Sequence, residues 1–137
     1  HYSIVVADDI NQDKVYVPSL ILNPIIENAI WHGLIPVKNE RRCELKIEVK
    51  IDSGMLWLII EDNGVGRHLQ PKSPGNIRES KGTHLTEQRL ANLNYLYNIS
   101  SARLEYEDLF DGSNSPAGTR VIITLPTDLN PQSHEQN

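Results

Sequence analysis

Three short stretches of this chain combine polar side chains and glycines in patterns that could bind a phosphorylated ligand. Residues 27–33 read ENAIWHG, residues 61–66 read EDNGVG and residues 80–85 read SKGTHL. The first stretch follows the apolar run VPSLILNPII, so its polar groups belong to a partly buried helix. A polar group buried without a partner costs about 2–7 kcal/mol. These side chains therefore face either water or a polar ligand.

The residue types in these stretches include groups that can bind magnesium and phosphate. The amide oxygen of Asn28 suits Mg²⁺, which usually binds one or two protein groups and completes its shell with water and phosphate. Asp62 ends an apolar stretch and offers a carboxylate acceptor, while Gly64 and Gly66 permit positive φ. A helix that begins near Thr86 would offer unpaired N–H groups and a positive dipole end to an anion. Taken singly, each stretch also fits an ordinary turn, a solvated helix face or a helix start.

Strands are expected to position these stretches. Apolar alternation and β-branched residues predict strands over 2–7, 43–51, 55–61, 102–107 and 118–125. The nearly continuous apolar run of 55–61 predicts a strand that is buried on both faces. Cys43, the single cysteine, is interpreted as a small apolar strand residue. Pro126 is expected to end the last strand.

Two helices complete the prediction. Pro24 is expected to begin or kink the first helix, and Gly33 to end it. The second helix is predicted over 86–98 with Thr86 as its cap, after a long functional loop over 62–85. This order of elements predicts an α+β fold, a two-layer α/β sandwich with a mixed sheet and helices on one face. The first helix is expected to turn these apolar residues toward the sheet: Leu22, Ile25 and Ala29.

Length and composition place the chain among single globular domains. It has 137 residues, and we expect one domain over 1–126 and a polar, disordered tail over 127–137. The net charge of −5, with no obvious basic patch, argues against a nucleic-acid partner. The apolar runs fall short of the roughly 20 residues that a membrane span needs. Because the chain opens in mid-pattern without Met, we expect it to be a piece of a longer protein.

In this order and at these separations, the three stretches resemble the ATP-binding domain shared by gyrase, heat-shock chaperones, histidine kinases and MutL, the GHKL or Bergerat fold. The likeness is greatest to the C-terminal ATP-binding domain of LytS-type sensor histidine kinases. It rests on the paired motifs P-x-x-x-L-x-P-x-x-E-N-A-x-x-H-G and D-N-G-x-G, and on the closing stretch GTRVIITLP. It extends from about Tyr2 to Pro126.

The resemblance implies a kinase that binds ATP and Mg²⁺. It makes Asn28 the Mg²⁺ ligand and Asp62 the acceptor of the adenine amino group. It also implies that Thr119 supports Asp62 and a water, and that His32 lies beside the nucleotide. Further residues implied at the base or the phosphates are Gly64, Gly66, Gly82 and Thr83. Three cations can add positive charge or stay solvated: Lys81, Arg67 and Arg78.

The partners implied by the resemblance lie outside this chain. The γ-phosphoryl group would pass to a histidine on an upstream helical segment, of the same protein or of its dimer mate, and then to a response regulator. None of the five histidines here belongs to a long amphipathic helix with an acidic neighbour, so the acceptor is expected elsewhere. The resemblance also implies a cytoplasmic domain of a bacterial sensor that is anchored in the inner membrane.

Three positions depart from the family pattern. Relatives that hydrolyse ATP carry a glutamate four residues before the asparagine, where this chain has Pro24, so slow hydrolysis to water is expected. Glu27 is the other candidate catalytic residue, about 100° round the helix from Asn28. Trp31 replaces a Lys or Arg of many histidine kinases, and His84 replaces the second glycine of Gly-x-Gly-Leu.

Two other readings stay open from the sequence. An anti-sigma-factor-type serine kinase has the same fold and works without an upstream histidine segment. A degenerate dimerisation module would no longer bind nucleotide, and the departures at Pro24, Trp31 and His84 keep this reading open. The serine kinase hypothesis differs from the histidine kinase hypothesis in the residue that accepts the phosphoryl group. The dimerisation hypothesis differs in that no nucleotide binds.

Overall fold

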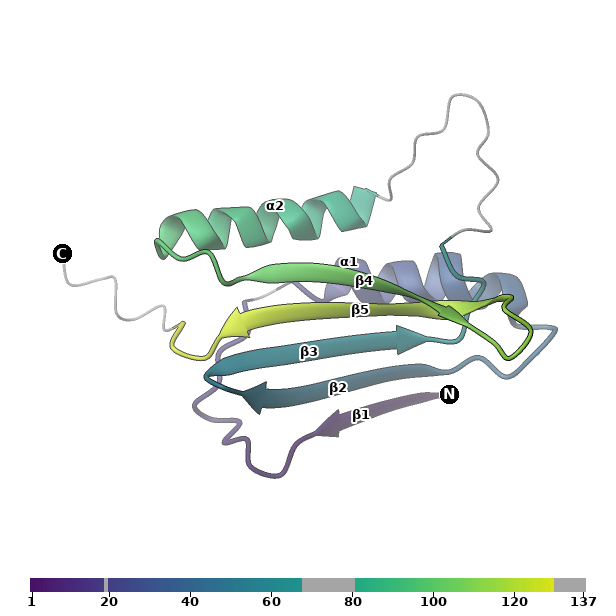
Figure 1. The fold of residues 1–137 in the computed structure, drawn as a ribbon, viewed down its shortest axis with the longest axis horizontal. Helices are drawn as coiled ribbons and strands as arrows, with labels where there is room; N and C mark the ends of the chain where they lie inside the picture. Colours follow the sequence, from purple (N-terminus) through teal and green to yellow (C-terminus); the bar gives the residue numbers. More distant parts are fainter. Residues whose placement is uncertain (19, 68–80, 130–137) are drawn as a thin grey trace.

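The strands of this chain pair into one five-stranded mixed sheet (Figure 1). The computed structural model describes residues 1–18, 20–67 and 81–129, with side chains from residue 84 onward in the last range. The strand order is β1-β2-β3-β5-β4, in which β1 and β2 are parallel and the other neighbours antiparallel. The strands are β1 (Tyr2–Val6), β2 (Leu45–Asp52), β3 (Met55–Asp62), β4 (Arg103–Phe110) and β5 (Pro116–Pro126).

The described helices lie on one face of this sheet (Figure 1). The first helical segment consists of α1 (Asn23–Asn28), the π-helical turn η1 (Ala29–Leu34) and the short 3-10 helix η2 (Ile35–Val37). The second is α2 (Lys81–Leu96), which packs against α1 and β4, while η1 contacts β3 and β5. This arrangement confirms the predicted α/β sandwich with helices on one face. None of the described helices is long and apolar enough to cross a membrane.

The core fills the space between the helices and the sheet. Every second side chain of β3 points into it, and three of them are at most 1 % exposed: Leu56, Leu58 and Ile60. The first helical segment faces them as predicted, with Ile25 and Ala29 buried in the same cluster and Leu22 packed against it. Fully burying one such aliphatic side chain contributes about 1.5–3 kcal/mol, so these contacts fix the helical segment on the sheet.

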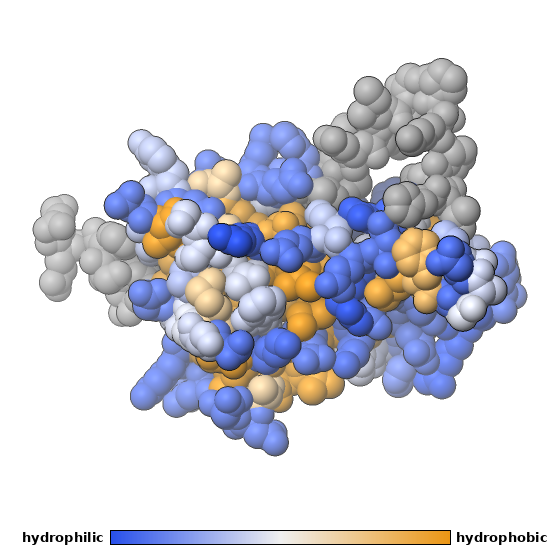
Figure 2. All heavy atoms as spheres, in the orientation of Figure 1, coloured by the Kyte–Doolittle hydropathy of each residue, from blue (hydrophilic) through white to orange (hydrophobic). Residues whose placement is uncertain are grey.

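The opposite face of the sheet is open to solvent. Figure 2 looks onto this face and shows hydrophilic residues around an area of hydrophobic ones. The side chains of β3 on this side are only half-buried: Met55, Trp57, Ile59 and Glu61. The prediction that residues 55–61 are buried on both faces is therefore wrong. Antiparallel strands commonly keep one wet face, and an apolar run does not reveal which of its residues lie there.

The boundaries of both predicted helices differ from those in the structure. Gly33 does not end the first helix, because the chain continues through η1 and into η2, which includes Pro36. The second helix spans Lys81–Leu96 instead of 86–98, so Thr86 is a fully buried residue inside the helix and not its cap. Glycine and threonine are weak helix formers, so local propensity hides the first turn of α2.

The remaining differences lie at strand ends. Cys43 precedes β2 instead of lying within it. Its thiol donates a weak hydrogen bond to the carbonyl oxygen of Leu34, at 3.3 Å. Pro126 ends β5 as predicted. Beyond it, Thr127 donates to the carbonyl of Gly54 and Leu129 is buried, so the packed part reaches Leu129. Residues 130–137 of the predicted disordered tail lie outside the described residues.

Candidate functional site

The carboxylate of Asp62, the last residue of β3, is buried at the edge of the core. Asp62 is only 5 % exposed, and its Oδ1 accepts a hydrogen bond from the Gly64 N–H at 2.8 Å. Burial raises the pKa of Asp62 from its ordinary value of 3.8 to about 6, although backbone N–H groups of Gly64 and Thr119 act in the opposite direction. A buried carboxylate with a strongly raised pKa is a candidate functional group.

Glycines bring three segments against Asp62. A Cβ atom at Gly33 would lie 2.8 Å from Oδ1 of Asp62, and one at Gly118 would lie 1.9 Å from its backbone oxygen. Gly64 packs on Gly33, where a Cβ would come within 2.3 Å of the carbonyl carbon. The N–H of Val65 donates to the Gly33 carbonyl at 3.1 Å. The end of β3, the start of β5 and η1 therefore meet with no room for a side chain between them.

The π-helical turn η1 docks the segment that carries Asn28 onto this junction. Asn28 is the last residue of α1 and is half-buried, and Gly33 follows it within η1. Short π-helical stretches occur frequently at functional sites. The neighbouring predicted site residues Glu27 and His32 are exposed, as is Trp31. Gly33 thus brings the helical segment that carries Asn28 into contact with the end of β3.

Two other predicted site residues belong to the same junction. Gly66 adopts φ of +75°, as expected, whereas Gly64 does not have a positive φ. Gly64 must be glycine for a different reason, the close contact with the backbone of Gly33. Thr119 is buried and lies directly opposite Asp62 in the ladder between β3 and β5.

The predicted phosphate-binding residues form the first turn of α2, as the structure describes it: Lys81, Gly82 and Thr83. The first N–H groups of a helix have no intrahelical partner. The nearby His84 is exposed, with its Nε2 3.0 Å from Nε2 of Gln88. Arg78, and residues 68–80 of the predicted loop, lie outside the described residues.

Arg67, a candidate cation for the phosphates, has other partners. Its guanidinium donates two hydrogen bonds to the carboxylate of Asp108, at 2.7 and 3.0 Å, and lies 4.9 Å from the ring centre of Tyr106. The hydrogen bond to Asp108 raises the pKa of Arg67. Arg67 therefore fastens the chain after β3 to β4.

Sequence reasoning missed two residues that hold the junction together. Nη2 of Arg41 donates to the carbonyl oxygen of Gly64 at 2.7 Å. The side chain of Asn63 points toward the segment before β2, where it accepts from the Glu44 N–H at 2.8 Å and donates to the Arg42 carbonyl at 2.9 Å. No spacing pattern in the sequence indicates either contact, because each joins residues about twenty positions apart.

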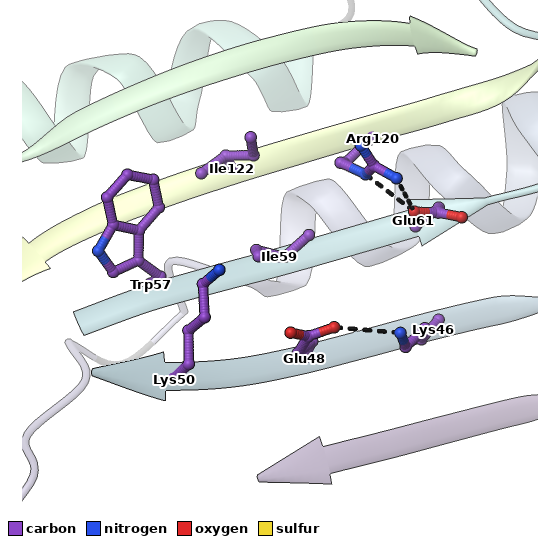
Figure 3. A pocket seen from close by; sticks show the side chains of 8 residues that line it. All are labelled: Lys46, Glu48, Lys50, Trp57, Ile59, Glu61, Arg120 and Ile122. Atoms are coloured by element: carbon purple, nitrogen blue, oxygen red, sulfur yellow. Dashed lines mark hydrogen bonds and ion pairs between the residues drawn. The ribbon is translucent and has the colours of Figure 1, made fainter. Parts of the chain in front are cut away.

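A shallow groove on the open face is separate from this junction (Figure 3). Arg120 crosses it between Glu61 and Glu107, with both contacts at 2.8 Å, and Lys50 Nζ lies 5.7 Å from the ring centre of Trp57. Partly exposed ion pairs of this kind contribute about 0–1 kcal/mol each. Its lining contains none of the predicted site residues: Lys46, Glu48, Lys50, Trp57, Ile59, Glu61, Arg120 and Ile122.

Comparison by sequence finds a curated relative. No protein-family model matches this chain. Over 110 residues the chain is 34 % identical to the sensor histidine kinase YesM of Bacillus subtilis strain 168. The match covers 80 % of this chain but only 17 % of the relative, so the chain spans a small part of that protein.

Comparison by structure finds histidine kinases. The histidine kinase domain of a blue-light activated histidine kinase from Erythrobacter litoralis EL346 superposes with a TM-score of 0.56 at 20 % identity, over 92 % of this chain and 54 % of that one. The catalytic domain of histidine kinase ThkA gives 0.55 at 14 % identity, over 92 % and 80 %. The mycobacterial sensor histidine kinase MprB gives 0.53 at 19 % identity, over 91 % and 80 %. By sequence this chain is a homologue of the sensor histidine kinases, and its fold is that of histidine kinase catalytic domains.

Proposed function

We propose that this chain binds ATP with Mg²⁺ and serves as the catalytic domain of a sensor histidine kinase. Its γ-phosphoryl donor would be ATP, and the acceptor would be a histidine on a helical segment that this chain does not contain. A response regulator would receive the phosphoryl group next. The sequence homology to a sensor histidine kinase and the shared fold support this proposal.

The buried carboxylate of Asp62 is the observation that carries the proposal. One carboxylate oxygen accepts the Gly64 N–H, and a carboxylate has capacity for further donors. The exocyclic amino group of adenine is such a donor, whereas guanine presents a carbonyl oxygen at the same position. Asp62 would therefore select ATP over GTP, because two acceptors repel each other. The glycines around Asp62 bring backbone directly against its carboxylate and its main chain, so no side chain stands between these segments and Asp62.

The available metal ligands fit Mg²⁺ that is bound together with a nucleotide. In the described part of the chain, no group of three or more His, Cys, Asp or Glu residues could hold a metal ion. The amide oxygen of Asn28 would supply one protein ligand, and phosphate and water the others. Bound magnesium would neutralise charge on the transferred phosphoryl group.

The residues near Asn28 favour transfer of the phosphoryl group to a protein acceptor over its transfer to water. Pro24, in the place of a general base, is buried near the start of α1 and has no proton-accepting side chain. Glu27 is exposed. Because it directly precedes Asn28, it lies about 100° round the helix from that residue. Catalysis of phosphoryl transfer depends mainly on positioning and on charge stabilisation. A domain without a water-activating base would hold ATP until the histidine arrives.

A competition experiment tests this proposal. A fluorescent ADP analogue is titrated onto the protein, and ATP or GTP is then added as a competitor. We expect saturable binding that ATP displaces and GTP does not, with at least tenfold weaker binding in Asp62→Ala. Equal displacement by ATP and GTP would contradict the role of Asp62, and no saturable binding at millimolar nucleotide would contradict the function itself.

A further inference from the structure

We propose that Arg41 is a positioning residue for the nucleotide site, which holds the loop after β3 so that the Asp62 carboxylate can accept the adenine amino group. The inference rests on the proposed function, and it concerns a residue outside the motifs that carry the family resemblance. Arg41 follows η2 in a polar stretch with no recognisable pattern. Its guanidinium donates a hydrogen bond to the backbone carbonyl of Gly64.

Arg41 and Gly33 hold the two ends of one peptide group. The carbonyl oxygen of Gly64 accepts from Arg41 Nη2 at 2.7 Å, and the N–H of the same peptide, from Val65, donates to the Gly33 carbonyl at 3.1 Å. Gly64 also donates its own N–H to Asp62. The bond is part-buried, with Gly64 buried and Arg41 exposed, so removing the Arg41 side chain would leave the Gly64 carbonyl without its protein donor. The position of the N–H that orients Asp62 thus depends on Arg41.

Arg41 also acts on Asp62 through its charge. Two charged groups influence the carboxylate: the neighbouring Glu61 raises the pKa of Asp62, and Arg41 lowers it. Both effects are smaller than the effects of burial and of the backbone N–H groups of Gly64 and Thr119, and the effect of Arg41 is the smallest of the five. Only an ionised carboxylate accepts from adenine with full strength, since charge-assisted hydrogen bonds are the stronger ones. Arg41 therefore favours the form of Asp62 that binds the base.

The adjacent Arg42 provides a matched control. Its side chain is 69 % exposed and its Nε lies 3.6 Å from Oε1 of Glu44, a weak surface contact. Asn63 bonds the backbone carbonyl of Arg42, which a side-chain substitution leaves in place. Arg41→Gln and Arg42→Gln therefore make the same change in net charge, but only the first removes the bond to Gly64. Arg41→Lys keeps the positive charge and an ammonium group that can donate hydrogen bonds.

The experiment uses two measurements on the wild-type protein and these three variants. The first is the pKa of Asp62 from its carboxyl ¹³C shift without nucleotide. The second is the affinity for a fluorescent ADP analogue between pH 5.5 and 8. In Arg41→Gln we expect the pKa of Asp62 to rise, because a nearby positive charge that favours the ionised carboxylate is lost. We expect affinity at pH 7 to fall about tenfold, with its pH midpoint shifted upward. Arg41→Lys should recover part of the wild-type pKa and affinity. Arg42→Gln should match the wild type in both measurements.

Other results would contradict either the positioning role of Arg41 or the proposed function. An unchanged pKa and unchanged affinity in Arg41→Gln would overturn the positioning role. Equal losses in Arg41→Gln and Arg42→Gln would overturn it too, because they would reflect net charge alone. A uniform loss of affinity with an unmoved pH midpoint would show a structural role only. If the wild-type protein bound no nucleotide, the proposed function would fail, and the apo pKa measurement would still test the contact of Arg41.

Discussion

Gly33 and Asp62 touch across the two layers of the fold. The backbone of Gly33 lies so close that a Cβ atom there would be 2.8 Å from Oδ1 of Asp62. This contact joins the π-helical turn that follows Asn28 to the end of β3. It places the two motifs that would bind metal and base on elements in direct contact.

Alanine at Gly33 should therefore damage stability. The added methyl group would meet the buried carboxylate, and inserting an atom into a packed region typically costs about 1–3 kcal/mol. Urea unfolding measures the loss. Gly112→Ala is the control, because nothing lies within 4 Å of its Cβ position. A Gly33→Ala variant as stable as Gly112→Ala would mean that the contact with Asp62 is not as close as described.

The fold itself could be predicted largely from sequence. The alternation in residues 43–51 and the turn after them indicate a hairpin, and β2 and β3 form it. Pro24 correctly marks the start of the first helix. These features are local, so periodicity and turn residues report them directly. The open face of β3 could not be predicted, because its exposure depends on where helices lie in three dimensions.

The site could be predicted in part. The D-N-G-V-G stretch drew attention to Asp62, which the structure buries with its carboxylate bonded to the Gly64 N–H; its role in nucleotide binding stays a prediction. The π-helical turn could not be seen, because Gly33 resembles an ordinary helix stop and only its packing against Asp62 shows otherwise. Arg41 was missed for a similar reason. Its bond to Gly64 spans 23 residues and leaves no periodic signal.

Removing the charge of Asp62 should change how stability depends on pH. The pKa of Asp62 is about 6 in the folded protein and near 3.8 when unfolded, so the folded state binds more protons between these values. The contribution of Asp62 to stability therefore falls as pH rises from about 4 to about 6, by at most about 3 kcal/mol, and stays constant above about 7. Asp62→Asn removes this pH-dependent contribution and keeps an oxygen that can accept from the Gly64 N–H.

Urea unfolding of both proteins between pH 4 and 8 tests this expectation, since other groups cancel in the difference. The stability of Asp62→Asn minus that of the wild type should increase up to about pH 6 and then level off. A difference that is independent of pH would show that the carboxylate has an ordinary pKa in the folded protein.

Asn28 should determine how much Mg²⁺ strengthens nucleotide binding. We expect Asn28→Ala to lose most of the gain in ATP affinity that Mg²⁺ produces, while binding without metal changes less than threefold. Losing one ligand in or near the metal shell typically costs roughly tenfold or more in affinity. Calorimetric titration with and without Mg²⁺ gives both numbers. Glu27→Gln, at the exposed neighbouring position, should keep the metal effect; an equal loss there would assign the ligand to Glu27 instead.

The ion pairs of the open face should contribute little. Arg120 joins Glu61 and Glu107, but its side chain is 37 % exposed, so we expect Arg120→Met to change the free energy of unfolding by less than about 1 kcal/mol. Nucleotide affinity should stay within twofold of the wild type. A larger change in affinity would connect the groove of Figure 3 to the nucleotide site.

In the proposed function, Asn28 and Asp62 contribute to one nucleotide site. Backbone and side-chain amide NMR spectra, recorded while Mg²⁺ and a non-hydrolysable ATP analogue are added, test this most directly. We expect saturable shifts of the Asn28 side-chain amide and of the backbone N–H groups of Asp62, Gly64 and Thr119, all with one dissociation constant. Shifts confined to the open-face groove, or separate constants for Asn28 and Asp62, would contradict it.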